Sequence, residues 1–335
     1  MSELGEQNEQ KQYPPNHPMS NADPNFTYDG GTLCRDYWPD WLAQLATNNV
    51  YRINNTITEA YDFLTLDSVQ YIFTICVRLR LPHDVRFVAA LLFDKFMCLQ
   101  TKSLWEFIAC SDMPVRKKEV EWEKIETNLS RQIPLRIASC IQIASKSGNY
   151  HTSLSLRQVA SSLRSLGHAY TKGAVLNSEI RILKTIGFAI PESPLIYPES
   201  LLKCLCSVPS IPSDLDYDSC WNHIVLFLDI VFLHHERLYT YLIQTLGSSR
   251  YTPQCSRYDH ARLKGDWMLL GCGLVAASVA CVHDDQLRDK VITTLNMMSG
   301  TPAEDILDMS TTLKKITLLL NEEKMTQKPQ RTVSY

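Results

Sequence analysis

From Leu66 onward, apolar residues recur along the chain at the three- and four-residue steps of an α-helix. One such face predicts a first helix that ends before Pro82, because the residue preceding a proline disfavours helical geometry. Pro82 then opens a second helix, whose apolar stripe extends over residues 85–99 and places Leu92 in the core. The pattern therefore predicts a helical domain that begins at Leu66.

The most apolar segment of this region follows Pro134, which we expect to start a third helix. Seven of the twelve residues 135–146 are apolar, and they occupy several faces of the predicted helix. A helix that is apolar nearly all round is buried on all sides, so we expect this helix to be central, with Ile141 in the core. Gly148 stands where a left-handed C-terminal cap is expected.

Two further helices complete a first set of five, and the first domain then covers residues 66–190. Ser155 and Gln158 have the spacing of a capping box, which predicts the start of a fourth helix. The fifth helix is predicted from near Thr171 to Gly187. The apolar positions that it carries are Val175, Leu176, Ile180, Leu183 and Ile186.

After Pro191 and Pro194 the helical pattern starts again and predicts a second domain over residues 195–320. Its helix from Trp267 is the most apolar of the set and follows the buried helix of the first domain by about 130 residues, which indicates a weak structural duplication. The five helices of this second set are predicted at residues 201–206, 221–242, 267–282, 287–298 and 303–320.

The segments outside the two sets are polar. Residues 1–35 contain almost no aliphatic side chains, so they cannot bury enough surface to offset the entropy of ordering, and we expect a disordered arm. Residues 36–65 hold a short amphipathic helix and a polar connection, which we expect to dock on the main body. Residues 321–335 are expected to form a flexible tail.

Within the first domain, residues 101–133 are predicted to be a charged insertion, helix or loop, anchored by Trp105 and Trp122. The basic run 116–118 could serve as a nuclear import signal or as a nucleic-acid contact. Glutamates follow at once at positions 119, 121 and 123. We therefore interpret the run as part of a solvated helix.

Composition excludes several classes of function. The formal net charge of −3 gives no overall attraction to a phosphate backbone, so no direct nucleic-acid binding is expected. The eleven cysteines are odd in number and lie mostly in apolar helical runs, which is typical of reduced thiols inside the cell. Residues 1–30 hold no apolar signal sequence. The longest uncharged apolar run, residues 267–282, is shorter than the roughly 20 residues needed to cross a bilayer, so no membrane partner is expected.

Neither catalysis nor a cofactor is expected. The chain holds no glycine-rich phosphate loop, no nucleophile elbow and no metal-chelating His-Glu helix. A metal site is also disfavoured, because Cys-x-Cys on a helix points the two sulfurs apart and no Cys-x-x-Cys pair exists. We predict that the protein is not an enzyme and has no catalytic, cofactor-binding or metal-binding residues. The cysteines and histidines considered for the metal site are Cys204, Cys206, His223, His234 and His235.

Two strings in the first domain resemble the cyclin box. Residues 135–146 read LRIASCIQIASK, and residues 170–190 read YTKGAVLNSEIRILKTIGFAI. Cyclins carry similar helices in the same order and near this spacing, and they repeat the five-helix unit. The resemblance implies an all-α protein made of tandem five-helix cyclin folds, the second degenerate, with a disordered N-terminal arm.

Within the cyclins, three features resemble the animal meiotic family named cyclin N-terminal domain-containing protein. They are the charged insertion, the string DWMLLGCGLVAAS at residues 266–278 and the string WLAQLATNN at residues 41–49. The resemblance implies a regulatory or scaffold role in meiotic recombination, promoting crossover designation and maturation in the nucleus, on meiotic chromosomes at crossover sites. The implied partners are meiotic crossover and recombination proteins and a cyclin-dependent kinase.

The cyclin resemblance also implies two contact residues. In cyclins that activate kinases, the lysine ending the first string and the glutamate of the second form the central polar contacts, and motif position assigns these to Lys146 and Glu179. Such a cyclin acts by pushing a kinase helix into place. Here Ser147, Gly148 and Asn149 stand where acidic residues often follow, and the Met-Arg and Asp-Trp signature for substrate docking has no counterpart. Substrate recruitment of that type is therefore not implied.

Two alternatives keep the double fold and change the function. One is a kinase-activating cyclin of cell-cycle or transcriptional control, and expression restricted to germ cells would favour the meiotic role over it. The other is a nucleic-acid-binding relative, as among the general transcription factors, which would require a basic groove. The net charge of −3 argues against the second alternative.

Overall fold

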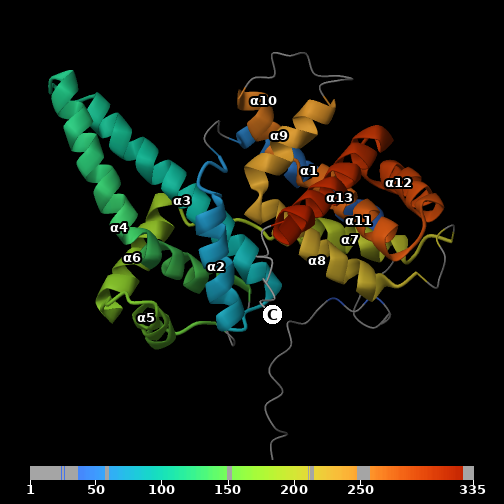
Figure 1. Ribbon diagram of the computed structural model, residues 1–335, viewed down its shortest axis with the longest axis horizontal. Helices are drawn as coiled ribbons and strands as arrows, with labels where there is room; N and C mark the ends of the chain where they lie inside the picture. The colour runs from blue at the N-terminus through green and yellow to red at the C-terminus, as the bar shows by residue number, and fades with distance from the viewer. Residues whose placement is uncertain are drawn as a thin grey trace, which may run out of the picture.

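The computed structural model describes residues 24, 26, 37–56, 60–148, 153–209, 211, 215–246 and 257–326, and these form thirteen helices and no strand (Figure 1). This confirms the predicted all-α, cyclin-like class. The predicted disordered arm lies outside the described residues except for Pro24 and Phe26. The helices are α1 (Trp38–Asn55), α2 (Leu66–Arg78), α3 (His83–Ala109), α4 (Val115–Gly148), α5 (Leu156–Ser165), α6 (Lys172–Thr185), α7 (Ile196–Leu205), α8 (Tyr217–Leu233), α9 (His235–Leu246), α10 (Arg257–Lys264), α11 (Trp267–Val282), α12 (Asp285–Ser299) and α13 (Ala303–Thr326).

Helices α2 to α6 form the first fold, with α4 at its centre (Figure 1). Residues 135–145 of α4 are all buried, because α2, α3, α5 and α6 pack around them. Ile141 keeps 1% of its surface exposed and Leu92 keeps none, which confirms both as core residues. The predicted central helix is therefore covered by protein on every side.

The predicted helix start at Pro134 is wrong, because α4 already begins at Val115 and Pro134 lies inside it. A proline inside a helix removes one backbone hydrogen bond and crowds the preceding turn. The part of α4 before the proline packs against α3. These tertiary contacts hold the helix continuous across a residue that on its own predicts a boundary.

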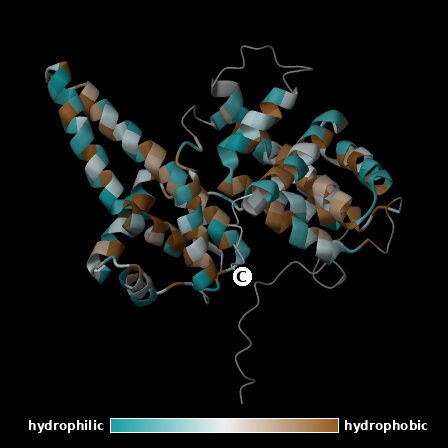
Figure 2. Cartoon of the chain, viewed as in Figure 1, coloured by the Kyte–Doolittle hydropathy of each residue, from teal (hydrophilic) through white to brown (hydrophobic). Residues whose placement is uncertain are grey.

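The charged insertion predicted for residues 101–133 consists of the end of α3 and the start of α4. The two form a helical hairpin that projects from the first fold, at the upper left of Figure 1. The rings of Trp105 and Trp122 meet edge to face across it, with centroids 5.1 Å apart. Near the tip, Nζ of Lys118 donates to the carbonyl of Ala109 at 2.6 Å. Figure 2 shows hydrophilic and hydrophobic residues mixed along the hairpin.

Two predicted helix starts are confirmed and one predicted cap is wrong. Ser155 and Gln158 form the reciprocal hydrogen bonds of a capping box at the start of α5. The side chain of Thr171 caps α6 by accepting from the backbone N–H of Ala174. Gly148 is the last residue of α4 and is not among the glycines with positive φ, because the helix continues through it. The left-handed cap expected there is absent at that residue.

Helices α7 to α13 form the second fold around α11, whose residues 267–279 are all buried. Small residues let its neighbours approach closely. A Cβ atom on Gly271 would lie 2.9 Å from the Cβ of Tyr197, and one on Gly273 would lie 2.2 Å from the Cγ of Met309. Neither position accepts a side chain without displacement of the neighbouring helix.

The prediction of one helix over residues 221–242 is wrong, because α8 ends at Leu233 and α9 begins at His235. His234, between them, has a non-helical φ of −123° and ψ of 36°. The break places His235 inside, 5% exposed, with its ring stacked on that of Tyr61 at 5.1 Å. The apolar pattern continues across the break and therefore did not indicate it. Helix α10 was not predicted either.

Helix α13 extends to Thr326, so the predicted flexible tail, residues 321–335, begins as helix. The carboxylate of Glu323 accepts two hydrogen bonds from the guanidinium of Arg237 on α9, at 2.7 and 3.1 Å. This bidentate contact fixes the last turns of α13 against the second fold. The rest of the predicted tail lies outside the described residues.

The predicted N-terminal helix is α1, and it docks on the second fold. Nε1 of Trp41 donates to the hydroxyl of Ser200 on α7 at 2.9 Å. Oδ1 of Asn49 accepts from the backbone N–H groups of Trp267 and Met268 at 2.9 and 3.2 Å. Helix α1 therefore supplies hydrogen-bond acceptors for the first turn of α11, where backbone N–H groups lack partners within the helix.

The two folds meet at a partly buried ion pair that lies beside aromatic rings. Nη2 of Arg86 on α3 lies 2.7 and 2.8 Å from the two carboxylate oxygens of Asp229 on α8. The guanidinium also lies over the rings of Phe73 and Phe87, and Phe87 packs against Phe232 with centroids 5.0 Å apart. Burial raises the pKa of Asp229 to about 6, although Arg86 opposes the shift.

We expect this ion pair to be coupled in the free energy of unfolding. Asp229→Leu leaves the Arg86 guanidinium buried without a counter-charge and should cost about 3–5 kcal/mol. Arg86→Met should cost less, because the Asp229 side chain is 25% exposed and its pKa is already raised. The double variant should regain most of the loss. Urea unfolding of the four proteins at neutral pH measures the coupling, and additive losses would contradict it.

Burial of His235 predicts a loss of stability in acid. Burial, assisted by Lys264, lowers the pKa of His235 to about 3 from 6.5. Between these values only the unfolded chain binds the proton, so stability falls as the pH drops below about 6.5. His235→Phe keeps a ring against Tyr61 and removes this proton uptake.

Relative to the wild type, His235→Phe should therefore gain about 1.4 kcal/mol in the free energy of unfolding between about pH 7.5 and pH 5.5. Urea unfolding of both proteins at the two pH values provides the measurement. Comparing the variant with the wild type cancels the opposite contributions of Asp94 and Asp229, whose raised pKa values favour the folded state as the pH falls. An equal difference at both pH values would refute a neutral, buried His235.

Candidate functional site

The structure brings together the two residues predicted as partner contacts. Lys146 lies in the last turn of α4, and its Nζ donates to Oε1 of Glu179 on α6 at 2.5 Å. The side chain of Glu179 is 10% exposed, whereas that of Lys146 is 38% exposed. The nearly buried carboxylate of Glu179 therefore holds the ammonium of Lys146 in place, and the ammonium remains accessible to solvent. That either residue contacts a kinase stays a prediction.

The position of this pair follows from the packing of α6 on α4. On the inner side of α6, Val175 and Ile182 are fully buried against α4 and its neighbours. Nη1 of Arg136, itself buried, donates to the hydroxyl of Ser178 at 2.8 Å. These contacts fix the rotation of α6 about its axis, so the next residue, Glu179, faces the end of α4.

Two of the apolar residues of the predicted fifth helix are exposed. Leu176 and Ile180 are 43% and 42% exposed, and they lie one helical turn apart on the outer side of α6. The core face is formed by Val175 and Ile182, and a helix cannot turn both sets inward. Sequence periodicity alone did not separate the two faces, because both carry aliphatic residues.

The segment after α6 also carries exposed apolar residues. Phe188 and Ile190 are 67% and 36% exposed. Gly187 and Phe188 both have left-handed backbone, with φ of 64° and 60°. Such a φ is rare and strained for a phenylalanine. Nζ of Lys95 on α3 holds the next residue by donating to the carbonyl of Ala189 at 2.8 Å.

Phe188 and Ile190 belong to the string at residues 170–190 that resembles the cyclin box, but neither was predicted as a contact residue. The only local signal is the glycine at position 187, which ends α6 with the two hydrogen bonds of a Schellman motif. That motif predicts a turn but not the direction of the following ring. We use the name α4–α6 face for the Lys146–Glu179 pair together with the exposed apolar residues of α6 and of the segment that follows it, which are Leu176, Ile180, Phe188 and Ile190.

The histidines and cysteines considered for a metal site are not gathered into one. Among the described residues, no group of three or more His, Cys, Asp or Glu side chains is placed to hold a metal ion. Cys204 is buried, and burial raises the pKa of its thiol to about 12. In the same part of the chain, no helix is long and apolar enough to span a membrane.

Comparison with known proteins agrees with this architecture. No protein-family model matches the chain. Human Cyclin N-terminal domain-containing protein 1 is 26% identical over 301 residues, which cover 88% of this chain and 88% of that protein. The mouse protein of the same name is 28% identical over 277 residues, covering 80% of each. The chain is thus a cyclin-like protein, similar along most of its length to the cyclin N-terminal domain-containing proteins.

Proposed function

We propose that this cyclin-like protein is a regulatory and scaffold factor in meiotic recombination, that it promotes crossover designation and maturation, and that its α4–α6 face binds a cyclin-dependent kinase. The observation that carries the kinase proposal is the Lys146–Glu179 pair at the edge of an exposed apolar surface. A polar anchor beside apolar area is the composition of a specific protein-binding surface.

The α4–α6 face suits a helix of a partner protein. The ammonium of Lys146 has three N–H donors, and the carboxylate of Glu179 accepts one of them. The other donors are available to carbonyl or carboxylate groups of the partner. Leu176 and Ile180 supply exposed aliphatic area, and the Phe188 ring supplies an exposed aromatic anchor. A kinase helix held in this way can be moved into its active position.

The meiotic part of the proposal rests on similarity in sequence. Relatives that cover 80–88% of the chain carry the name of the family that the insertion and the strings at 41–49 and 266–278 resemble. Nuclear localisation at crossover sites on meiotic chromosomes, and association with crossover and recombination proteins, belong to the same proposal. The alternative, a kinase-activating cyclin of cell-cycle or transcriptional control, would use the same face, and expression outside the germline would favour it.

The kinase contact is tested by affinity purification from germline extract with mass spectrometry. We expect the wild type to recover a cyclin-dependent kinase together with recombination factors. Lys146→Ala with Glu179→Ala should lose the kinase, because the variant removes the polar anchor of the face. A matched control is Lys124→Ala with Glu121→Ala, which removes an exposed ion pair on the hairpin. The control should recover the same proteins as the wild type.

Three results would overturn parts of this proposal. Recovery of recombination factors without any kinase would leave a scaffold and remove the kinase contact. Equal kinase recovery by the wild type and the face variant would show that the kinase binds elsewhere. Equal loss in the control variant would also contradict the assignment to the α4–α6 face, because that pair lies on the projecting hairpin.

A second prediction separates partner binding from stability at Phe188. Phe188→Gly should leave the thermal midpoint unchanged or higher, because glycine adopts a φ of 60° without strain. The same variant should weaken binding of the recovered kinase by about 2 kcal/mol, as loss of an aromatic anchor does. The control Phe107→Ala removes a 77% exposed ring from the hairpin. It should leave the affinity for the kinase unchanged and should not raise the thermal midpoint. Titration calorimetry and thermal unfolding provide the two readouts, and full binding by Phe188→Gly would exclude the ring as an anchor.

A further inference from the structure

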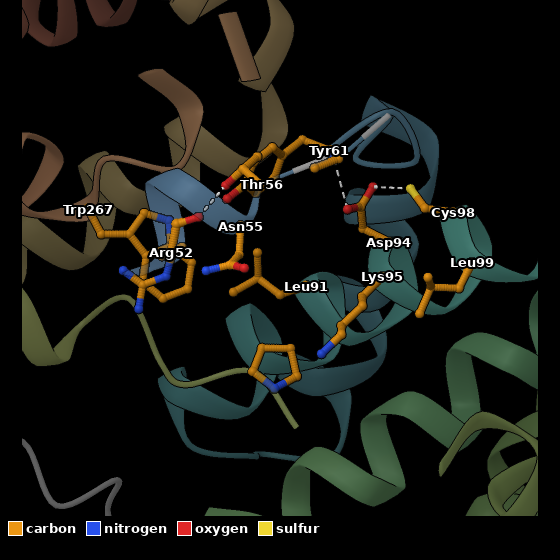
Figure 3. A pocket seen from close by; sticks show the side chains of 12 residues that line it. Arg52, Asn55, Thr56, Tyr61, Leu91, Asp94, Lys95, Cys98, Leu99 and Trp267 are labelled. Atoms are coloured by element: carbon orange, nitrogen blue, oxygen red, sulfur yellow. Dashed lines mark hydrogen bonds between the residues drawn. The ribbon is translucent and has the colours of Figure 1, made fainter. Parts of the chain in front are cut away.

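A cavity of about 280 Å³ lies between the end of α1, the connection to α2, α3 and the segment that follows α6. Figure 3 shows Arg52 and Trp267 at one end, Asp94 and Cys98 at the other, and Lys95 between them. Its walls are mainly apolar, with Leu91, Leu99 and Pro191 among the residues that form them. Apolar walls with a few polar groups are typical of binding sites.

Lys95 is the polar group of this cavity with unused hydrogen-bonding capacity. Its half-buried side chain makes one hydrogen bond, to the carbonyl of Ala189 at 2.8 Å. Burial lowers the pKa of Lys95, and no carboxylate contributes a shift in the opposite direction. A partly buried ammonium whose charge is not balanced favours an anionic ligand.

The other charged groups of the cavity are already engaged. The guanidinium of Arg52 lies 3.6 Å from the centroid of the Trp267 ring and donates to Tyr197 and Glu192. The carboxylate of Asp94 is 4% exposed and accepts the backbone N–H groups of Tyr61 and Phe63 at 2.8 and 2.9 Å. The charge of Arg52 is therefore offset by Glu192, and the negative charge of Asp94 is bound by backbone donors.

We propose that this cavity binds a short segment of a partner protein in which an aliphatic side chain stands next to an acidic one. The aliphatic side chain packs against Leu91 and Leu99, and the carboxylate binds Nζ of Lys95. The volume lies just below the roughly 300–1,000 Å³ of pockets for small molecules, so it suits one or two side chains of a peptide. The occupant need not be a kinase, so the inference does not depend on the proposed function.

The cavity lies close to exposed apolar residues, because Pro191, which lines it, directly follows Ile190 in the chain. Ala189, which Lys95 binds, stands between the exposed residues Phe188 and Ile190 of the α4–α6 face. A partner chain that crosses this face reaches the mouth of the cavity within a few residues. The cavity therefore provides a second contact of different chemistry, based on one buried aliphatic group and one ion pair.

The test uses the full chain with ¹³C-labelled methyl groups and a defined probe. The probe is the acetylated, amidated peptide Gly-Ser-Leu-Glu-Leu-Ser-Gly, and its control has Gln in place of Glu. We expect the probe to shift the methyl signals of Leu91 and Leu99 and to leave that of Leu163, in the core of the first fold, unchanged. The Gln peptide should bind about tenfold more weakly, since a charge-assisted hydrogen bond is lost.

Matched variants assign the charge contact. Lys95→Gln can still donate to the carbonyl of Ala189, so the fold is retained, and it should remove the preference for the Glu peptide. Lys102→Gln makes the same change at an exposed position of the same helix and should preserve that preference. Lys146→Ala with Glu179→Ala should leave probe binding unchanged, which separates the cavity from the α4–α6 face.

Three results would overturn the inference. Absence of shifts at Leu91 and Leu99 at millimolar peptide would show that the cavity takes no such segment. Equal affinity of the Glu and Gln peptides for the wild type would exclude recognition by Lys95. Binding of free 4-methylpentanoate, which combines the same aliphatic group with a carboxylate, without binding of the peptide would show that the cavity takes small carboxylates.

Discussion

The complete burial of the second half of α4 is the constraint on which the first fold depends. Residues 135–145 are buried without interruption, so protein must surround the helix on all sides. Four helices do so, and this requirement sets their arrangement more than any local propensity does. Polar side chains inside the segment must then find hydrogen-bond partners within the fold, as Arg136 does with the hydroxyl of Ser178. Lys146 is the first exposed residue after the buried segment, so its position at the surface is set by the point where that segment ends.

The second fold meets the same constraint with different residues. Helix α11 is buried over residues 267–279, yet its neighbours approach through Gly271 and Gly273, whereas α4 uses branched aliphatic side chains. Its first turn is capped from outside the fold by Asn49 of α1. A buried central helix can therefore be kept while its sequence changes from large to small residues. This explains how the second fold keeps a fully buried central helix without the branched aliphatic residues of α4.

The sequence predicted the structural features that are determined by nearby positions of the same helix. The burial of Ile141 and the capping box at Ser155 are of this kind, because periodicity and cap spacing determine them. The continuity of α4 through Pro134 and the break at His234 were missed, since both depend on packing between distant segments. The proximity of Lys146 and Glu179, 33 positions apart, followed from the cyclin resemblance and not from spacing. The outward direction of Phe188 had no signal, because its backbone conformation is unusual for its residue type.

The segment after α6 joins the α4–α6 face to the cavity beside α1, and this adjacency changes how their affinities combine. Phe188 and Ile190 present side chains to the face, while the carbonyl between them is held by Lys95 in the cavity. A partner that occupies both sites binds the second without a further loss of translational freedom, so two weak contacts give a combined affinity well above either. Such a partner loses much of its affinity when either contact is removed. Two separate partners would each respond to one site alone, so the response of a partner to changes at both sites shows whether it spans them.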